Sequence, residues 1–234
     1  MSFLQGWGND ELRYLQADAF GGYDGIYAGR AGGKVVEVAC MAHCRRKFHE
    51  ARSSDPARSA QALAYIRLLY DVESQAQERF TAQRDSENAH SLPAIRLELR
   101  QSLAVPRLEQ FRAWLEAQQA VNGGGVLPKS PIGQAITYAL NQWQALCVYC
   151  TDGDLDIDNN VAERALRRIA VGRANWTFCG SDNGGNTAAV LFSFIATCER
   201  HDVNPFEYLR NVLSRIAEQP ISKLAELLPW RWKP

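Results

Sequence analysis

The chain has 234 residues, of which 46% are hydrophobic, and its 26 lysines and arginines balance 26 aspartates and glutamates. This length and apolar content suffice for a buried core, in one large domain or two smaller ones. A neutral chain excludes a uniformly basic surface, so any contact with nucleic acid must be local. No apolar run is long enough to predict a membrane span, and the start lacks a signal-peptide pattern. We therefore expect a cytoplasmic protein whose cysteines are mostly reduced.

Two strands are predicted near the start of the chain. Residues 12–18 (LRYLQAD) form a short strand pattern that ends at Asp18 and is broken by Gly21 and Gly22. Residues 34–40 (KVVEVAC) alternate in polarity and are rich in β-branched side chains. Because two strands alone do not make a stable sheet, either further strands are disguised in the sequence or part of the sheet is absent.

Helical patterns dominate the rest of the chain. The predicted helices cover residues 42–55, 58–88, 93–120, 131–150, 160–170, 185–200 and 205–217. Between the helices 160–170 and 185–200, the segment 175–180 (NWTFCG) is predicted to be a short extended piece. The apolar tail 227–234 (LLPWRWKP) is expected to dock against the preceding helices.

The stretch 152–163, DGDLDIDNNVAE, carries five carboxylates. One interpretation is an EF-hand calcium loop, with Asp152, Asp154, Asp156 and Glu163 at loop positions 1, 3, 5 and 12. Against it, Ile157 takes the position at which the loop's sharp turn needs a glycine. The sequence also offers no second loop to pair with it. We therefore favour two other interpretations, a solvated acidic turn and a helix start that carries Glu163.

These two interpretations divide the stretch between them. The first three aspartates would form a solvated acidic turn. Residues 158–160 (DNN) are typical helix-starting residues, so Glu163 falls in a first helical turn, where the helix dipole favours an anion. Its carboxylate is then either a capping group that pairs with Arg167 or a catalytic group.

A basic cluster surrounds Glu163 in the sequence. It consists of Arg164, Arg167, Arg168 and Arg173. A carboxylate among arginines suits a site where a metal ion and phosphate meet, although a solvated basic face is an equally good interpretation. Asp18 is the natural counterpart of Glu163, because it ends a strand and is followed by a glycine-containing loop.

Two cysteine pairs raise the question of zinc. They are Cys147-x-x-Cys150 and Cys40-x3-Cys44, the second with His43 between its members. The first pair shares the apolar face of the 131–150 helix, where free cysteines behave as small hydrophobic residues. We therefore do not predict a zinc site. The remaining histidines, His49, His90 and His201, are predicted to lie on the surface.

Five segments together resemble the insertion-sequence-66 family of bacterial transposases. They are LQADAFGGYDGIY (15–27), VACMAHCRRKF (38–48), LPKSPIGQAITYALNQW (127–143), DIDNNVAERALRRIAVGRANWTFCGSDNGG (156–185) and LLPWRW (227–232). They extend over nearly the whole chain, and the run NNVAERALRRIAVGRANW is long enough to make chance agreement negligible.

The resemblance implies a fold and a site. It implies a ribonuclease-H-like catalytic domain with an Asp-Asp-Glu triad, in which Asp18 is the second aspartate and Glu163 the glutamate. The expected class is α/β and helix-rich, with an incomplete catalytic core in 1–54 and 128–184. A helical insertion would occupy 55–127, and a C-terminal helical region 185–234.

The resemblance also implies a cofactor and partners. The triad would hold Mg²⁺ or Mn²⁺ for metal-dependent DNA cleavage and strand transfer. DNA phosphates would meet Arg45, Arg46 and Lys47 as well as the basic cluster around Glu163. His43, Asn159 and Asn160 would support the site, and Trp176 would either stack on a flipped base or lie in the core. Transposon ends, target DNA and other transposase subunits are the expected partners.

The first aspartate of the implied triad has no clear counterpart. Asp10 is the only aspartate before Asp18, eight positions upstream, which is too close for a separate first strand. We therefore expect an N-terminally truncated transposase with little activity of its own. The alternative function is a catalytically inactive remnant that binds DNA or a partner, and an EF-hand-like calcium-binding protein is the third hypothesis.

Overall fold

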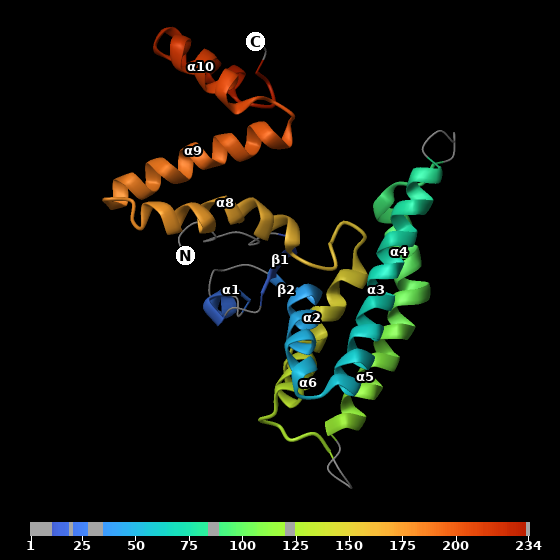
Figure 1. The fold of residues 1–234 in the computed structure, drawn as a ribbon. Coiled ribbons are helices and arrows are strands. Elements are labelled where there is room, and N and C mark those ends of the chain that lie inside the picture. The colour runs from blue at the N-terminus through green and yellow to red at the C-terminus, as the bar shows by residue number, and fades with distance from the viewer. Residues whose placement is uncertain (1–10, 19–20, 28–34, 84–88, 120–124, 233–234) are drawn as a thin grey trace. The chain divides into compact units, whose positions relative to one another are not determined.

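The computed structural model describes residues 11–18, 21–27, 35–83, 89–119 and 125–232 (Figure 1). The side chains of residues 168 and 173–175 also lie outside this description. The chain divides into two compact units, unit 1 (Met1–Val161) and unit 2 (Ala162–Pro234). Each unit is described by itself. The predicted domain boundaries stay a prediction.

The two strands of unit 1 form a parallel pair. β1 (Arg13–Ala17) and β2 (Val35–Ala39) run in register from Arg13 opposite Val35 to Ala17 opposite Ala39. Both predicted strands are therefore confirmed within one residue. Val38 is fully buried, which fits the β-branched pattern of β2. The described part of the connection holds η2 (Gly21–Tyr23) and α1 (Asp24–Tyr27).

The helix after β2 ends where its sequence predicts. α2 (Met41–Glu50) passes into the short 3-10 turn η3 (Ala51–Ser53). Asp55 then caps α3 (Pro56–Ala82), since its Oδ1 accepts the Arg58 N–H at 3.0 Å. Proline at the first helical position costs nothing, because that N–H has no helical partner in any case.

The predicted helix 93–120 is interrupted in its middle. α4 (Leu92–Leu99) passes into a π-helical segment, η4 (Arg100–Ala104), and then into α5 (Val105–Gln119). Pro106 explains the interruption, because it lacks an N–H and its ring clashes with the carbonyl four residues earlier. The wider π turn accommodates the proline ring while the helix continues from α4 into α5.

The pattern 131–150 is also divided. It forms α6 (Pro131–Asn141), α7 (Trp143–Cys147) and η5 (Val148–Thr151), with the break at Gln142. Most of the predicted apolar face is nevertheless buried in the core of unit 1, including Ile136, Trp143 and Cys150.

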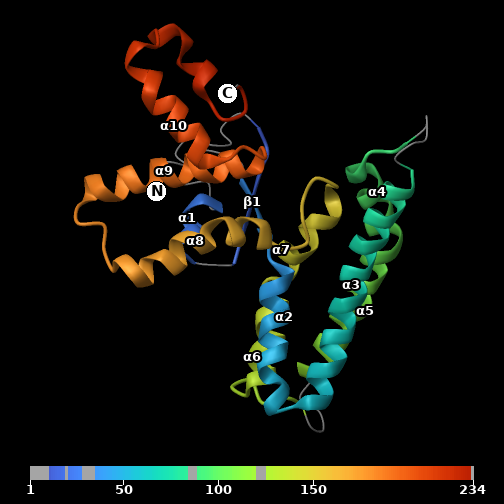
Figure 2. The same cartoon turned by 45° about the horizontal axis from the view of Figure 1, so that its top comes forward.

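The core of unit 1 lies between helices. Figures 1 and 2 show α2 beside α6, and α3 beside α5. Phe111 of α5 is fully buried at the centre of an aromatic cluster. Its ring centroid lies 5.2 Å from that of Tyr65, 5.8 Å from that of Trp143 and 6.1 Å from that of Phe48. The predicted insertion helices thus share one core with α2 and α6.

Unit 2 is made of helices. α8 (Asn160–Trp176), which begins in the last two residues of unit 1, is followed by α9 (Asp182–Arg200) and α10 (Pro205–Arg215). The short helical turns η6 (Ile216–Glu218) and η7 (Ile221–Leu227) come after them. α8 is longer than predicted and includes the first part of the segment expected to be extended.

The tail docks as predicted. The Tyr208 hydroxyl donates to the carbonyl oxygen of Leu227 at 2.7 Å, and Trp232 Nε1 donates to Asn211 Oδ1 at 3.1 Å. Both Tyr208 and Leu227 are buried in the small core of this unit. Within the described residues of the whole chain, no helix combines the length and the apolar character needed to cross a membrane.

We predict that Phe111→Ala lowers the free energy of unfolding by about 3–5 kcal/mol, because it leaves a cavity among aromatic rings. Leu97→Ala is the matched control, since the Leu97 side chain is 37% exposed, and it should cost less than about 1 kcal/mol. Urea denaturation followed by circular dichroism measures both. Equal costs would contradict the placement of the core.

Candidate functional site

Asp18, the predicted catalytic aspartate, lies at the carboxyl edge of the sheet. Because β1 and β2 are parallel and Ala17 pairs with Ala39, the residues that follow both strands lie at one edge. Asp18 follows β1 there and is exposed, whereas Cys40 follows β2 and is fully buried. In open α/β sheets this is the edge at which ligands bind.

Two helices contribute side chains near this edge. His43 is half-buried in the first turn of α2, the helix that begins directly after Cys40. Tyr138 comes from α6, and burial raises its pKa to about 12, with smaller contributions from Cys44, Cys40 and Asp18. The Tyr138 hydroxyl is buried and has no hydrogen-bond partner in the part of the chain that the structure describes. Tyr138 therefore stays protonated at neutral pH and keeps a free donor.

The segment before α8 docks onto the same edge. Gln16 Nε2 in β1 donates to the Asp156 carbonyl oxygen at 2.7 Å, and the Met41 N–H donates to the Ile157 carbonyl oxygen at 3.1 Å. The Asn159 N–H lies 3.5 Å from Cys40 Sγ. Unit 1 thus brings Asn159 to the strand ends, although it lies far from both strands in the sequence. Its side-chain oxygen is buried without a partner among the described residues.

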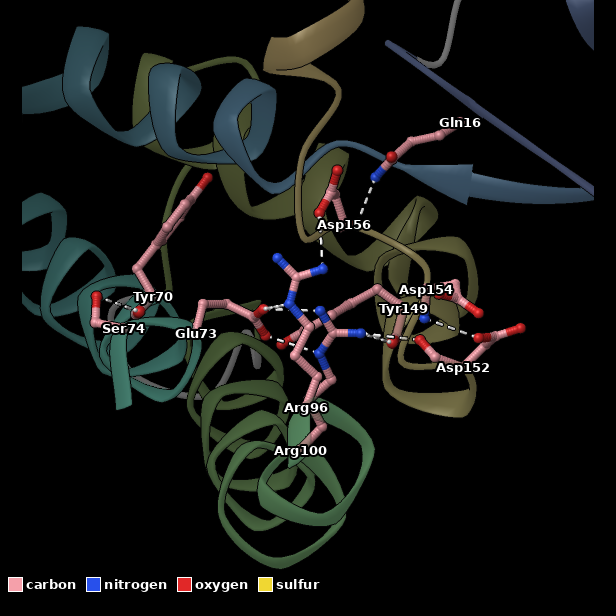
Figure 3. Close-up of polar contacts among 10 residues, drawn as sticks. All are labelled: Gln16, Tyr70, Glu73, Ser74, Arg96, Arg100, Tyr149, Asp152, Asp154 and Asp156. Atoms are coloured by element: carbon pink, nitrogen blue, oxygen red, sulfur yellow. Dashed lines mark hydrogen bonds and ion pairs between the residues drawn. The ribbon is translucent and has the colours of Figure 1, made fainter. Parts of the chain in front are cut away.

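A buried ion pair holds this segment from the other side (Figure 3). Arg100 in η4 is fully buried, and its Nε and Nη2 donate to the two carboxylate oxygens of Glu73 at 2.8 and 2.7 Å. Its Nη1 donates to the carbonyl oxygens of Tyr149 and Asp152 at 2.8 and 2.9 Å. Four of the five N–H donors of the guanidinium group are thereby bonded within the protein.

A second arginine ties the acidic residues into the same network. Arg96 Nη1 lies 3.2 Å from Asp156 Oδ1, and Arg96 Nε lies 3.6 Å from Glu73 Oε2. In Figure 3 both arginines converge on Glu73, with the acidic segment beyond them. Gly153 completes the fit, because a Cβ there would lie 1.9 Å from the carbonyl oxygen of Pro93.

The acidic stretch is a turn, as expected, but it is not solvated throughout. Asp154 is exposed and its N–H donates to Asp152 Oδ1 at 2.9 Å, whereas the 45% exposed Asp156 is paired with Arg96 and Gly153 is buried. The EF-hand hypothesis gains no support, since Asp156, one of its expected ligands, is paired with Arg96, and no three such side chains gather among the described residues. The sequence missed the network because its partners come from the predicted insertion.

Glu163 and the basic cluster belong to unit 2. Glu163 lies half-buried in the first turn of α8, as predicted, and Arg164 and Arg167 are exposed. Arg168 and Arg173 fall within α8, but their side chains lie outside the description. Since Asp18 belongs to unit 1, the pairing of Asp18 with Glu163 stays a prediction.

Trp176 ends α8 and is partly covered. Its ring lies parallel to that of Phe192, with centroids 5.5 Å apart and an interplanar angle of 8°. The side chain is still 37% exposed. One ring face is thus occupied by Phe192, and stacking on a base stays a prediction for the rest of the ring.

The expectation of a bound metal ion stays a prediction. Among the described residues no three His, Cys, Asp or Glu side chains gather closely enough to hold a metal ion. The cysteines are free thiols, and burial raises the pKa of Cys150 to about 11. Cys147 and Cys150 therefore behave as apolar residues, in agreement with the sequence. His49, His90 and His201 are exposed, as predicted.

Family models match almost the entire chain. One described as "Transposase IS66 family" matches residues 2–187, and one described as "IS66 C-terminal element" matches residues 193–230. No solved structure matches the chain significantly. The helix-rich architecture with a small sheet agrees with the predicted α/β class, whereas the ribonuclease-H-like fold has no structural neighbour to support it.

Three curated proteins of Sinorhizobium fredii (strain NBRC 101917 / NGR234) are similar over 94% of this chain. The protein y4hP is 35% identical over 227 residues, and y4qI and y4jD are each 31% identical, over 226 and 225 residues. All three bear the description "uncharacterized protein". The chain spans 39% of the length of y4hP and y4qI and 41% of that of y4jD.

We predict that Arg100→Met destabilises unit 1 by about 3–5 kcal/mol, because it leaves the Glu73 carboxylate without its main partner. Hydrogen exchange should also lose protection around residues 153–157. The double substitution Glu73→Leu/Arg100→Met should recover part of the loss, since it removes both charges. Chemical denaturation measures the free energy of unfolding of both variants. A loss of less than about 1 kcal/mol for Arg100→Met would refute the stabilising role of this ion pair.

Proposed function

We infer the function from the family: this chain belongs to the IS66 family of transposases, and we propose that it acts in DNA transposition. The observation that carries the proposal is the pair of family matches, which together extend from residue 2 to residue 230. Because the chain spans about two fifths of its curated relatives, the proposal concerns the part played by these residues.

We propose Asp18 and Glu163 as the catalytic carboxylates that this chain supplies, within a ribonuclease-H-like domain. The exposure of Asp18 at the carboxyl edge of the sheet supports its role. The place of Glu163 in a first helical turn supports its role, because the helix dipole favours an ionised carboxylate there.

Carboxylate oxygens are ligands that suit Mg²⁺ or Mn²⁺. Such an ion would supply Lewis-acid activation for phosphoryl transfer. The described residues of either unit do not bring three such ligands together. The part assigned to this chain is to offer two carboxylates and to bind DNA beside them.

DNA phosphates are the proposed partners of the exposed basic residues. Arg45, Arg46 and Lys47 form an exposed run on α2, directly after the sheet edge that carries Asp18. Lys47 Nζ lies 5.6 Å from the centroid of the Tyr138 ring, which holds the ammonium group close to that edge. The cluster of Arg164, Arg167, Arg168 and Arg173 on α8 is proposed to serve the same purpose beside Glu163.

A second candidate function is the binding of DNA or of a protein partner without catalysis. Large apolar side chains of unit 2 favour it, since Phe206 and Leu213 on α10 are each 70% exposed and Ile221 is 88% exposed. Exposed apolar groups of this size often mark protein contacts. Other transposase subunits are the partners that this candidate implies.

We predict that the Mg²⁺-dependent cleavage of labelled element-end DNA by this chain is weak and depends on both carboxylates. Asp18→Asn and Glu163→Gln should each lower the cleavage rate about a hundredfold or more, because each removes charge from the reacting centre. Neither should weaken DNA binding. Asp154→Asn is the control, since Asp154 is exposed and acidic but lies outside the proposed site.

The outcomes separate the two candidates. Cleavage that resists both substitutions would refute the assigned carboxylates. Binding of the end DNA without any cleavage, under conditions in which a full-length relative cleaves it, would favour the second candidate.

A further inference from the structure

A groove in unit 1 has no assigned role. It lies between α2 and α3, next to the segment that leads into α8, and has a volume of about 580 Å³. Ala42, Ala60 and Ala64 line its walls together with Leu63, so much of the lining is small and apolar. Arg45, Arg67 and Tyr70 line it as well. Small-ligand clefts commonly measure about 300–1,000 Å³.

Two arginines line this groove from different helices. Arg45 on α2 is exposed and has neither a hydrogen-bond nor an ion-pair partner in the described part of the chain. The Arg67 side chain on α3 is 84% exposed, and its Nε lies 4.0 Å from Asp71 Oδ2, at the limit of an ion pair. Such an exposed pair holds its arginine weakly.

Other arginines of unit 1 are committed to partners inside the protein. Arg100 and Arg96 bind Glu73, Arg58 binds Asp55 at 2.8 Å, and Arg79 binds Glu98 at 2.8 Å. The arginines of the groove differ from these, since they retain their donors for a ligand from outside.

The inner end of the groove is a fixed hydrogen-bonded unit. The Tyr70 hydroxyl donates to Asp158 Oδ2 at 2.8 Å, and the Asn160 N–H donates to Asp158 Oδ1 at 3.0 Å. Burial, followed by the bond to Asp158, raises the pKa of Tyr70, which therefore stays protonated. Each oxygen of Asp158 thus accepts one hydrogen bond from within unit 1. Its charge still opposes an anion.

We propose that this groove binds a phosphodiester group of DNA between Arg45 and Arg67. The proposal rests on the proposed function, because it names a DNA contact of the same chain. The guanidinium fork matches phosphate oxygens, and the alanines let a sugar-phosphate strand approach the helices closely. Arg67 belongs to the predicted helical insertion, so the insertion takes part in DNA binding as well as in the core.

Fluorescence anisotropy of the full chain with a fluorescein-labelled duplex of the element end tests the proposal at several salt concentrations. Arg67→Gln and Arg45→Gln should each weaken binding several-fold. Each should also make the slope of log K against log salt shallower by about one, the loss of one phosphate contact. Asp158→Asn should bind at least as tightly as the unsubstituted chain, because it removes a negative charge and keeps an acceptor for Tyr70.

Arg52→Gln is the matched control, since Arg52 is exposed and follows α2 but does not line the groove. If Arg67→Gln weakens DNA binding no more than the control does, the proposed phosphate site in the groove is overturned. The proposal that the unsubstituted chain binds DNA would still stand. Failure of the unsubstituted chain to bind the duplex overturns the proposed DNA-binding function together with the groove. Thermal melts confirm that each variant is folded.

Discussion

The buried guanidinium group of Arg100 is the constraint on which the geometry of unit 1 depends. A charge taken out of water costs several kcal/mol unless every donor finds an acceptor. Arg100 comes close to this condition, because four of its five N–H donors are bonded, two to Glu73 and one each to the carbonyl oxygens of Tyr149 and Asp152. Its guanidinium carbon also lies 5.0 Å from the centroid of the Tyr149 ring. The helices α3 and α4 are thereby fixed to the segment that precedes α8.

This attachment sets what can meet at the sheet edge. With its outer side held by Arg96 and Arg100, the acidic segment presents its inner side to β1 and to the start of α2. Asn159 reaches Cys40 in this way, and Asp158 reaches Tyr70 at the end of the groove. The predicted helical insertion is therefore part of the framework of the candidate site. It also contributes one wall of the groove.

Much of the secondary structure could be predicted, because its signals are local. The β-branched run predicts β2, and the helical pattern that begins at residue 58 predicts α3, which starts two residues earlier at Pro56. The interruption at η4 was missed although Pro106 signals it, because the apolar period continues across it. In the candidate site, the positions of Asp18 and Glu163 came from motif resemblance, whereas Tyr138 was passed over as one more residue of an apolar helix.

The sequence by itself determined the family and the order of the elements, since motifs and periodicity are carried by neighbouring residues. Only the tertiary structure decided the role of the acidic stretch. Asp156 and Gln16 are 140 positions apart, and Arg100 lies 49 positions before Tyr149. No local pattern distinguishes a solvated aspartate from one whose partner comes from a distant helix. That distinction depends on how the helices pack, and packing brings Glu73, Arg96 and Arg100 to the acidic segment.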